Sequence, residues 1–190
     1  MKKTPVFGIM LAVIVYLAMF LLGATTGLIH PACFGYAGTF LPLLFAFAYY
    51  YTAANMRCFG AAALLNGFVL IVALIMGEGN PPLIIGMLLF AAIAEIIRMR
   101  SGYDTRKGVR RSFIPFAFSF YAYSAHWWTD PEGTLTAAVE EMSAGYADKV
   151  RPIIENIPVL ILMLALTVPV AVLAIRLAEK ALKKQASKLK

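Results

Sequence analysis

The chain has 190 residues, of which 61% are hydrophobic and 14% are charged, and it carries a formal net charge of +7. Its mean hydropathy of +0.78 excludes an ordinary soluble domain, and its length leaves room for one membrane domain over 1–190. No basic stripe lies on a soluble segment and no nucleic-acid motif is present, so we expect the positive charge to face anionic lipid and we expect no nucleic-acid partner.

Six apolar stretches are each close to the ~20 residues that a helix needs to cross ~30 Å of hydrocarbon. We therefore expect an all-α integral membrane protein with six transmembrane helices. The expected spans are residues 5–26, 33–52, 59–77, 81–97, 112–128 and 153–177.

Positive charge falls on alternate connections between these stretches. Fifteen of the seventeen Lys and Arg residues lie before the first stretch, after the second, after the fourth, or at and beyond the end of the sixth. The other three connections hold only Lys149 and Arg151 among basic residues. By the positive-inside rule, we expect both termini to be cytoplasmic. We also expect a multi-pass protein of a prokaryotic plasma membrane.

The first stretch leaves two alternatives open. Lys2 and Lys3 before an apolar run also fit a signal peptide, although a run of ~20 residues favours a retained span. Gly8 and Ala12 are small residues four positions apart, which lets another helix approach closely. That helix could belong to this protein's own bundle or to a partner membrane protein.

Two polar side chains are expected inside the spans. Asn66 needs a hydrogen-bond partner, which could be a neighbouring helix or a substrate. Glu95 lies three residues before Arg98 on one helix face, and we expect the two to pair near the inner interface. A proton-coupling role for Glu95 is the alternative.

The last outer connection predicts an amphipathic helix over the outer mouth of the bundle. Asp130 is a good N-cap and a proline follows it. An apolar stripe then recurs at steps of four, three, four and four residues. Its members are Leu135, Val139, Met142, Tyr146 and Val150.

The chain lacks the motifs of common catalysts and nucleotide-driven pumps. It has no phosphate-binding Gly-x-x-x-x-Gly-Lys-Ser/Thr loop, no His-Glu-x-x-His and no Gly-x-Ser-x-Gly. The polar groups inside the spans are too few for an ion relay. We expect a substrate-capturing protein that is not itself an enzyme and that is driven by another component.

Several short motifs carry a family resemblance through their order and spacing. They are Phe59-Gly60-Ala61, Gly77, Ala94-Glu95-Ile96-Ile97-Arg98, Gly102-Tyr103, the aromatic fifth stretch, Glu141-Met142-Ser143-Ala144-Gly145-Tyr146 and the Lys-rich end of the sixth stretch. With them the chain resembles the S components of energy-coupling factor (ECF) transporters, and more narrowly the MptD-like or Trep_Strep family.

This resemblance implies six helices with both termini inside and the capture of a micronutrient on the outer face. It also implies docking onto a T component driven by two cytoplasmic ATPases, through small residues of the first helix, here Gly8 and Ala12. Two alternatives stay open: a small membrane enzyme acting on lipid or prenyl substrates, and an accessory membrane protein with no ligand.

We expect an outward-opening cavity, because polar and aromatic groups converge only at the outer connections. The expected lining is His30, Glu78, Asn80, His126, Trp127 and Tyr146, with Asn66 as a floor.

The ligand is expected to be vitamin-like, or flat and aromatic as haem is, while no resident cofactor or metal is expected. For haem, His30 would be the first axial ligand and Cys33 or His126 the second. Alternatively, His30 caps the turn in which it lies.

Overall fold

The structure is a computed structural model, and it describes residues 6–190, which form helices without any strand. The helices in chain order are α1 (Val6–Thr25), η1 (Thr26–Leu28), α2 (Pro31–Gly35), α3 (Ala37–Phe40), α4 (Pro42–Met56), α5 (Ala61–Ile75), α6 (Pro81–Ser101), α7 (Arg106–Phe116), α8 (Ser119–Ser124), α9 (His126–Thr129), α10 (Pro131–Glu141), α11 (Tyr146–Glu155), α12 (Ile157–Ala181) and α13 (Lys183–Ala186).

Three of these segments are long and apolar enough to cross a membrane unbroken: Val6–Leu28, Pro81–Ser101 and Ile157–Ala181. They correspond to the first, fourth and sixth expected spans. The third expected span is the shorter helix α5, of 15 residues.

The second and fifth expected spans are each broken into three short helices. A proline, which has no N–H to donate within a helix, lies beside one of the two breaks in each of these spans. Pro42 opens α4 directly after α3, and Pro115 lies in the last turn of α7, just before that helix ends. A hydropathy reading cannot detect such breaks, because the residues on either side remain apolar.

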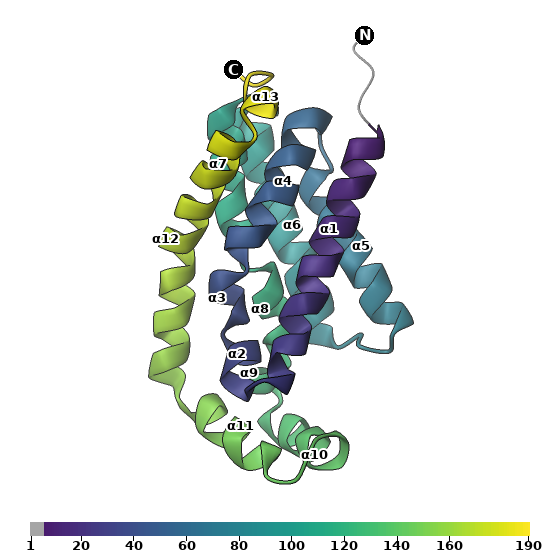
Figure 1. Cartoon of the computed structure of the whole chain (residues 1–190), viewed down its shortest axis with the longest axis vertical. Helices are drawn as coiled ribbons and strands as arrows, with labels where there is room; N and C mark the ends of the chain where they lie inside the picture. Colours follow the sequence, from purple (N-terminus) through teal and green to yellow (C-terminus); the bar gives the residue numbers. More distant parts are fainter. Residues whose placement is uncertain (1–5) are drawn as a thin grey trace.

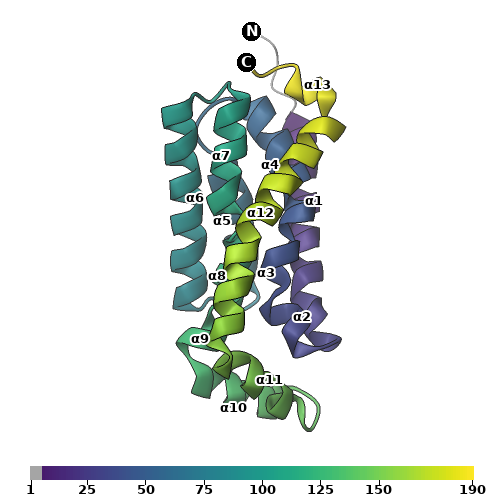
Figure 2. The same cartoon turned by 90° about the vertical axis from the view of Figure 1, so that its left-hand side faces the viewer.

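The long helices pack side by side into an elongated bundle. Figure 1 shows the first turn of α1 and the last helix, α13, at one end, with α10 and α11 at the other. The view at 90° in Figure 2 shows the same separation of the two ends. The most extensive helix–helix contacts join α6 with α7, α12 with α4, α5 with α6, and α1 with α4.

The small residues of α1 lie inside this bundle. A Cβ atom at Gly8 would overlap the Tyr51 hydroxyl of α4, and Ala12 is buried with 8% of its surface exposed. This face therefore packs on α4. These contacts support the alternative of packing within the bundle over the expectation that Gly8 and Ala12 dock a partner.

Glu95 and Arg98 form a buried pair near the end of the bundle where α13 lies. Their Oε1 and Nη1 atoms lie 3.5 Å apart, and Glu95 Oε1 also accepts the Ala62 backbone N–H at 2.7 Å. Arg98 Nη2 donates to the Ala53 carbonyl at 3.1 Å, and its guanidinium lies 5.2 Å from the Tyr103 ring centroid. The pair thus ties α6 to α4 and to the start of α5.

The expected single amphipathic helix is two helices that meet at a turn. α10 ends at Glu141, where Met142 takes an extended conformation, and Gly145, with φ +79° in the left-handed region that favours glycine, precedes α11. The stripe fails at its centre, where Val139 is 71% and Met142 40% exposed, while Thr134 and Ala138 are buried instead. The Asp130 N-cap is confirmed, because its Oδ1 accepts the Gly133 N–H at 3.1 Å.

Candidate functional site

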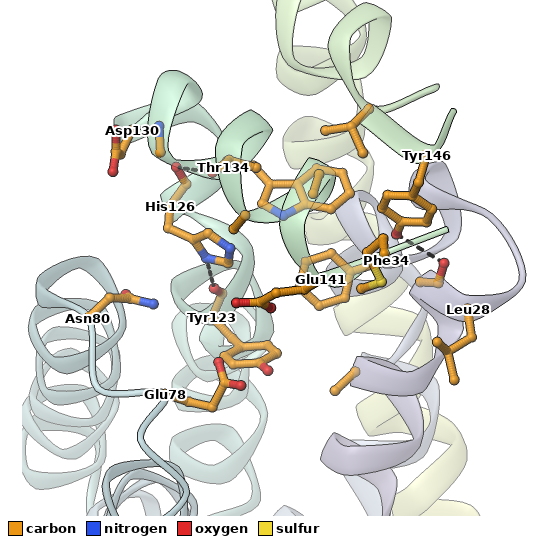
Figure 3. Close-up of a pocket in the computed structure, with 18 residues that line it drawn as sticks. Leu28, Phe34, Glu78, Asn80, Tyr123, His126, Asp130, Thr134, Glu141 and Tyr146 are labelled. Atoms are coloured by element: carbon orange, nitrogen blue, oxygen red, sulfur yellow. Dashed lines mark hydrogen bonds between the residues drawn. The ribbon is translucent and has the colours of Figure 1, made fainter. Parts of the chain in front are cut away.

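A cavity of about 430 Å³ lies at the end of the bundle opposite α13, between the bundle and the two helices α10 and α11. Its volume falls within the range of small-molecule sites. It is lined by Ala24, Gly27, Leu28, Phe34, Glu78, Asn80, Tyr123, His126, Trp127, Asp130, Gly133, Thr134, Ala137, Ala138, Glu141, Met142, Tyr146 and Val150. Figure 3 shows most of the labelled side chains, among them Phe34, Glu78 and Glu141, around a shared space between α6, α9, α10 and the α1–α2 region.

One wall of the cavity is aromatic. The rings of Phe34 and Trp127 lie 5.0 Å apart between centroids, and those of Phe34 and Tyr123 5.6 Å apart. Gly35 allows this packing, because a Cβ there would lie 3.3 Å from the Trp127 ring. The break between α8 and α9 turns His126 and Trp127 toward α2.

The roof is tied to the bundle by two hydrogen bonds. The Tyr146 hydroxyl of α11 donates to the Gly27 carbonyl at 3.0 Å, and the Thr134 hydroxyl of α10 donates to the His126 carbonyl at 3.2 Å. Burial raises the pKa of Tyr146, so this phenol stays protonated and remains a donor. Both short helices are therefore fixed across the cavity mouth.

Three carboxylates line the cavity, Glu78 from the connection before α6 and the other two from the ends of α10, Asp130 at its N-cap and Glu141 at its last residue. Figure 3 shows Glu78 and Glu141 directed toward the space below His126, with Asp130 farther out. Asn80 uses its Oδ1 to cap α6, accepting the Leu83 N–H at 2.9 Å, which leaves its amide N–H groups available.

The structure brings together five of the seven residues expected to bind substrate: Glu78, Asn80, His126, Trp127 and Tyr146.

The other two expected residues lie elsewhere. His30 is exposed, and its Nδ1 accepts the Ala32 N–H at 3.1 Å as the N-cap of α2. The alternative that it caps its turn is therefore correct, and His30 is not placed to ligate a molecule in this cavity. Cys33 is also outside the lining, and within residues 6–190 no three His, Cys, Asp or Glu side chains group as a metal site.

Asn66 is not a floor of the outer cavity but a connector between helices. It accepts the Tyr16 hydroxyl at 2.9 Å and donates to the Met87 carbonyl at 3.1 Å and to Ser119 Oγ at 2.9 Å. These bonds join α5 to α1, α6 and α8. Asn66 also borders a second, smaller cavity of about 170 Å³ between α5 and α6, which Glu95 lines as well.

Several lining residues escaped the sequence reading. From the sequence, Phe34 and Tyr123 fall within expected apolar spans, and Glu141 falls outside the apolar stripe of the expected amphipathic helix. Their signal was position relative to a break: Phe34 lies in α2, Tyr123 near the end of α8, and Glu141 at the end of α10. Chain breaks bring side chains to a cavity that an unbroken helix would direct elsewhere.

A family model described as a hypothetical bacterial integral membrane protein (Trep_Strep) matches residues 3–188. No curated protein and no solved structure matches the chain.

Proposed function

The chain belongs to the Trep_Strep family of bacterial integral membrane proteins, and on this premise we propose a six-span topology with both termini cytoplasmic. In this topology the broken segments α2–α4 and α7–α9 each act as one span, in a multi-pass protein of the bacterial plasma membrane. The charge distribution supports it. The basic α6–α7 connection and α13 lie at one end of the bundle, and the acidic α10 lies at the other.

Within this topology we assign the chain the role of substrate-binding S component of an ECF-type importer, capturing a micronutrient on the extracellular face. The observation that carries the proposal is the cavity under α10 and α11. It combines an aromatic wall, polar side chains from several elements and a roof fixed by two hydrogen bonds.

The chain itself would not hydrolyse ATP. Energy would come from a T component and two cytoplasmic ATPases, because the sequence has no nucleotide-binding loop. Gly8 and Ala12 are engaged within the bundle, so a partner would contact α1 through other residues.

The rival function, an enzyme acting on lipid or prenyl substrates, would need reactive groups open to the bilayer near Glu95. Glu95 Oε1 is instead held by the Ala62 N–H and by Arg98, which in turn is held by the Ala53 carbonyl. These contacts favour a structural role for the pair and support the transporter.

The test is to purify the tagged chain from a bacterium that carries it, and to identify bound small molecules and proteins by mass spectrometry. We expect one compound to co-purify with the native chain together with a T component and two ATPases. Ala138→Trp fills the cavity from α10 and should release the compound. Ala144→Trp, in the exposed turn outside the lining, is the matched control and should retain it.

Two results would contradict the proposal. One is a compound that is equally abundant in the native chain and Ala138→Trp, since that compound would bind elsewhere. The other is a native chain that brings down neither a compound nor ATPases.

A further inference from the structure

The charged side chains that line the outer cavity are all acidic. Glu78, Asp130 and Glu141 line it, and among the described residues (6–190) no Lys or Arg does. Within that same part of the chain neither Glu78 nor Glu141 forms an ion pair. The nearest basic side chains in sequence, Lys149 and Arg151, are exposed on α11 and outside the lining. The three carboxylates are themselves exposed, so the mouth of the cavity presents negative charge that no lining basic side chain compensates.

The histidine in the wall adds an acceptor. His126 Nδ1 lies 2.8 Å from the Tyr123 carbonyl oxygen. A carbonyl can only accept, so Nδ1 carries the hydrogen, and in the uncharged ring Nε2 is left as an acceptor. The cavity thus offers the carboxylates and this nitrogen to a ligand that donates hydrogen bonds.

The aromatic wall favours the same ligand charge. Ring faces carry partial negative charge and attract cations, with larger gains where water is excluded. Trp127 is 6% exposed and packs on Phe34, whose ring also contacts Tyr123 on the same side of the cavity. These rings also provide apolar contact for the body of an organic molecule.

Two other ligand classes fit these side chains less well. A bare metal ion needs closely grouped ligands, and the three carboxylates do not form such a group. An anionic ligand, including haem with its two carboxylates, would face three acidic groups with no basic partner.

We propose that the outer cavity selects an organic cation, a protonated amine or amidine carried on an aromatic or apolar body. The inference rests on the proposed function, since it names the chemical class of the captured substrate. Glu78 and Glu141 bind the positive group, and Phe34, Tyr123 and Trp127 hold the body.

The experiment compares two probes with the same ring and opposite charge, tryptamine and indolepropionate. Binding to the purified full chain in neutral detergent is followed by saturation-transfer NMR, with empty micelles as background. The test variant is Glu78→Gln with Glu141→Gln. The matched control is Glu132→Gln with Glu140→Gln, which removes two exposed carboxylates of α10 outside the lining. Ala138→Trp reports whether binding occurs in the cavity.

Tryptamine should bind saturably and at least tenfold more tightly than indolepropionate. The Glu78/Glu141 variant should weaken it by roughly tenfold, the size of a lost hydrogen bond to a charged group. The Glu132/Glu140 control should leave its affinity unchanged, and Ala138→Trp should abolish its binding.

Equal binding of both probes, with Ala138→Trp abolishing both, would overturn the charge selection and leave the proposed cavity intact. Binding of neither probe also overturns it. If the compound that co-purifies with the native chain persists in Ala138→Trp, the proposed function itself fails, whatever the probes show.

Discussion

Asn66 carries the sharpest stability prediction, because one buried side chain joins four helices. Asn66→Leu keeps the approximate size of the side chain but removes three hydrogen bonds, to the Tyr16 hydroxyl, the Met87 carbonyl and Ser119 Oγ. Side-chain hydrogen bonds between membrane helices contribute on average about 0.6 kcal/mol each, so the three account for about 2 kcal/mol. The Tyr16 hydroxyl, on a side chain with 0% exposure, is then left without its acceptor, which costs about 1 kcal/mol more. We expect a total loss of about 3 kcal/mol.

The assay is equilibrium unfolding in mixed micelles of a mild detergent and dodecyl sulfate. A second substitution, Tyr16→Phe, should change stability in opposite directions in the two backgrounds. Tyr16→Phe alone should destabilise the chain, but in the Asn66→Leu background it removes the stranded hydroxyl and should restore about 1 kcal/mol. If the two substitutions destabilise additively, the network does not exist as described. Asn66 lies outside the outer cavity, so ligand binding there should survive in the folded fraction.

Three further changes test other parts of the bundle. Arg98→Leu leaves its buried carboxylate partner uncompensated and should cost about 3–5 kcal/mol in the same titration; a cost below about 1 kcal/mol would contradict the buried pair. Gly8→Leu should push α1 away from Tyr51 and destabilise the isolated chain by about 1–3 kcal/mol. If the stability of the isolated chain is unchanged, this face of α1 does not pack on α4 and is again a candidate for partner docking. The hydrogen bond from Lys190 lowers the pKa of Asp104 below its usual 3.8. The stabilisation from this contact is therefore present above pH 3.8 and is lost as pH falls through the lowered pKa of the folded state. Unfolding curves at stepwise lower pH should converge for the wild type and Asp104→Asn, and a gap that widens on acidification would refute this coupling.

Hydropathy and charge predicted the helical class and the places where apolar helices lie. They could not predict whether the helix within each expected span is continuous. The 33–52 and 112–128 stretches look as apolar as the unbroken ones, yet both are interrupted. One break in each lies beside a proline, which changes hydrogen bonding while hardly changing hydropathy. The outer helix was misread for a related reason. A periodic stripe assumes one helix axis, and Gly145 starts a second axis at a left-handed turn.

At the site, sequence reading found the polar residues near the outer connections because few alternatives existed. For His30 the sequence left a ligand and a cap open, and the contact to the Ala32 N–H decides for the cap. Sequence reading misplaced Asn66 because depth along a helix does not show which neighbours surround a side chain. It missed Phe34 because the helix break that turns this ring into the cavity leaves no clear mark in composition.

The roof of the cavity differs in kind from the bundle beneath it. α10 and α11 are helices of 11 and 10 residues, and the described hydrogen bonds that tie their side chains to the bundle are those of Tyr146 and Thr134. Short helices with few tertiary bonds open at lower free energy than the elements they cover. We expect their amide protons to exchange with solvent much faster than those of α6, and a bound ligand to slow that exchange. The residence time of a ligand then follows the opening of this roof, so a molecule can enter and leave while the rest of the bundle stays folded.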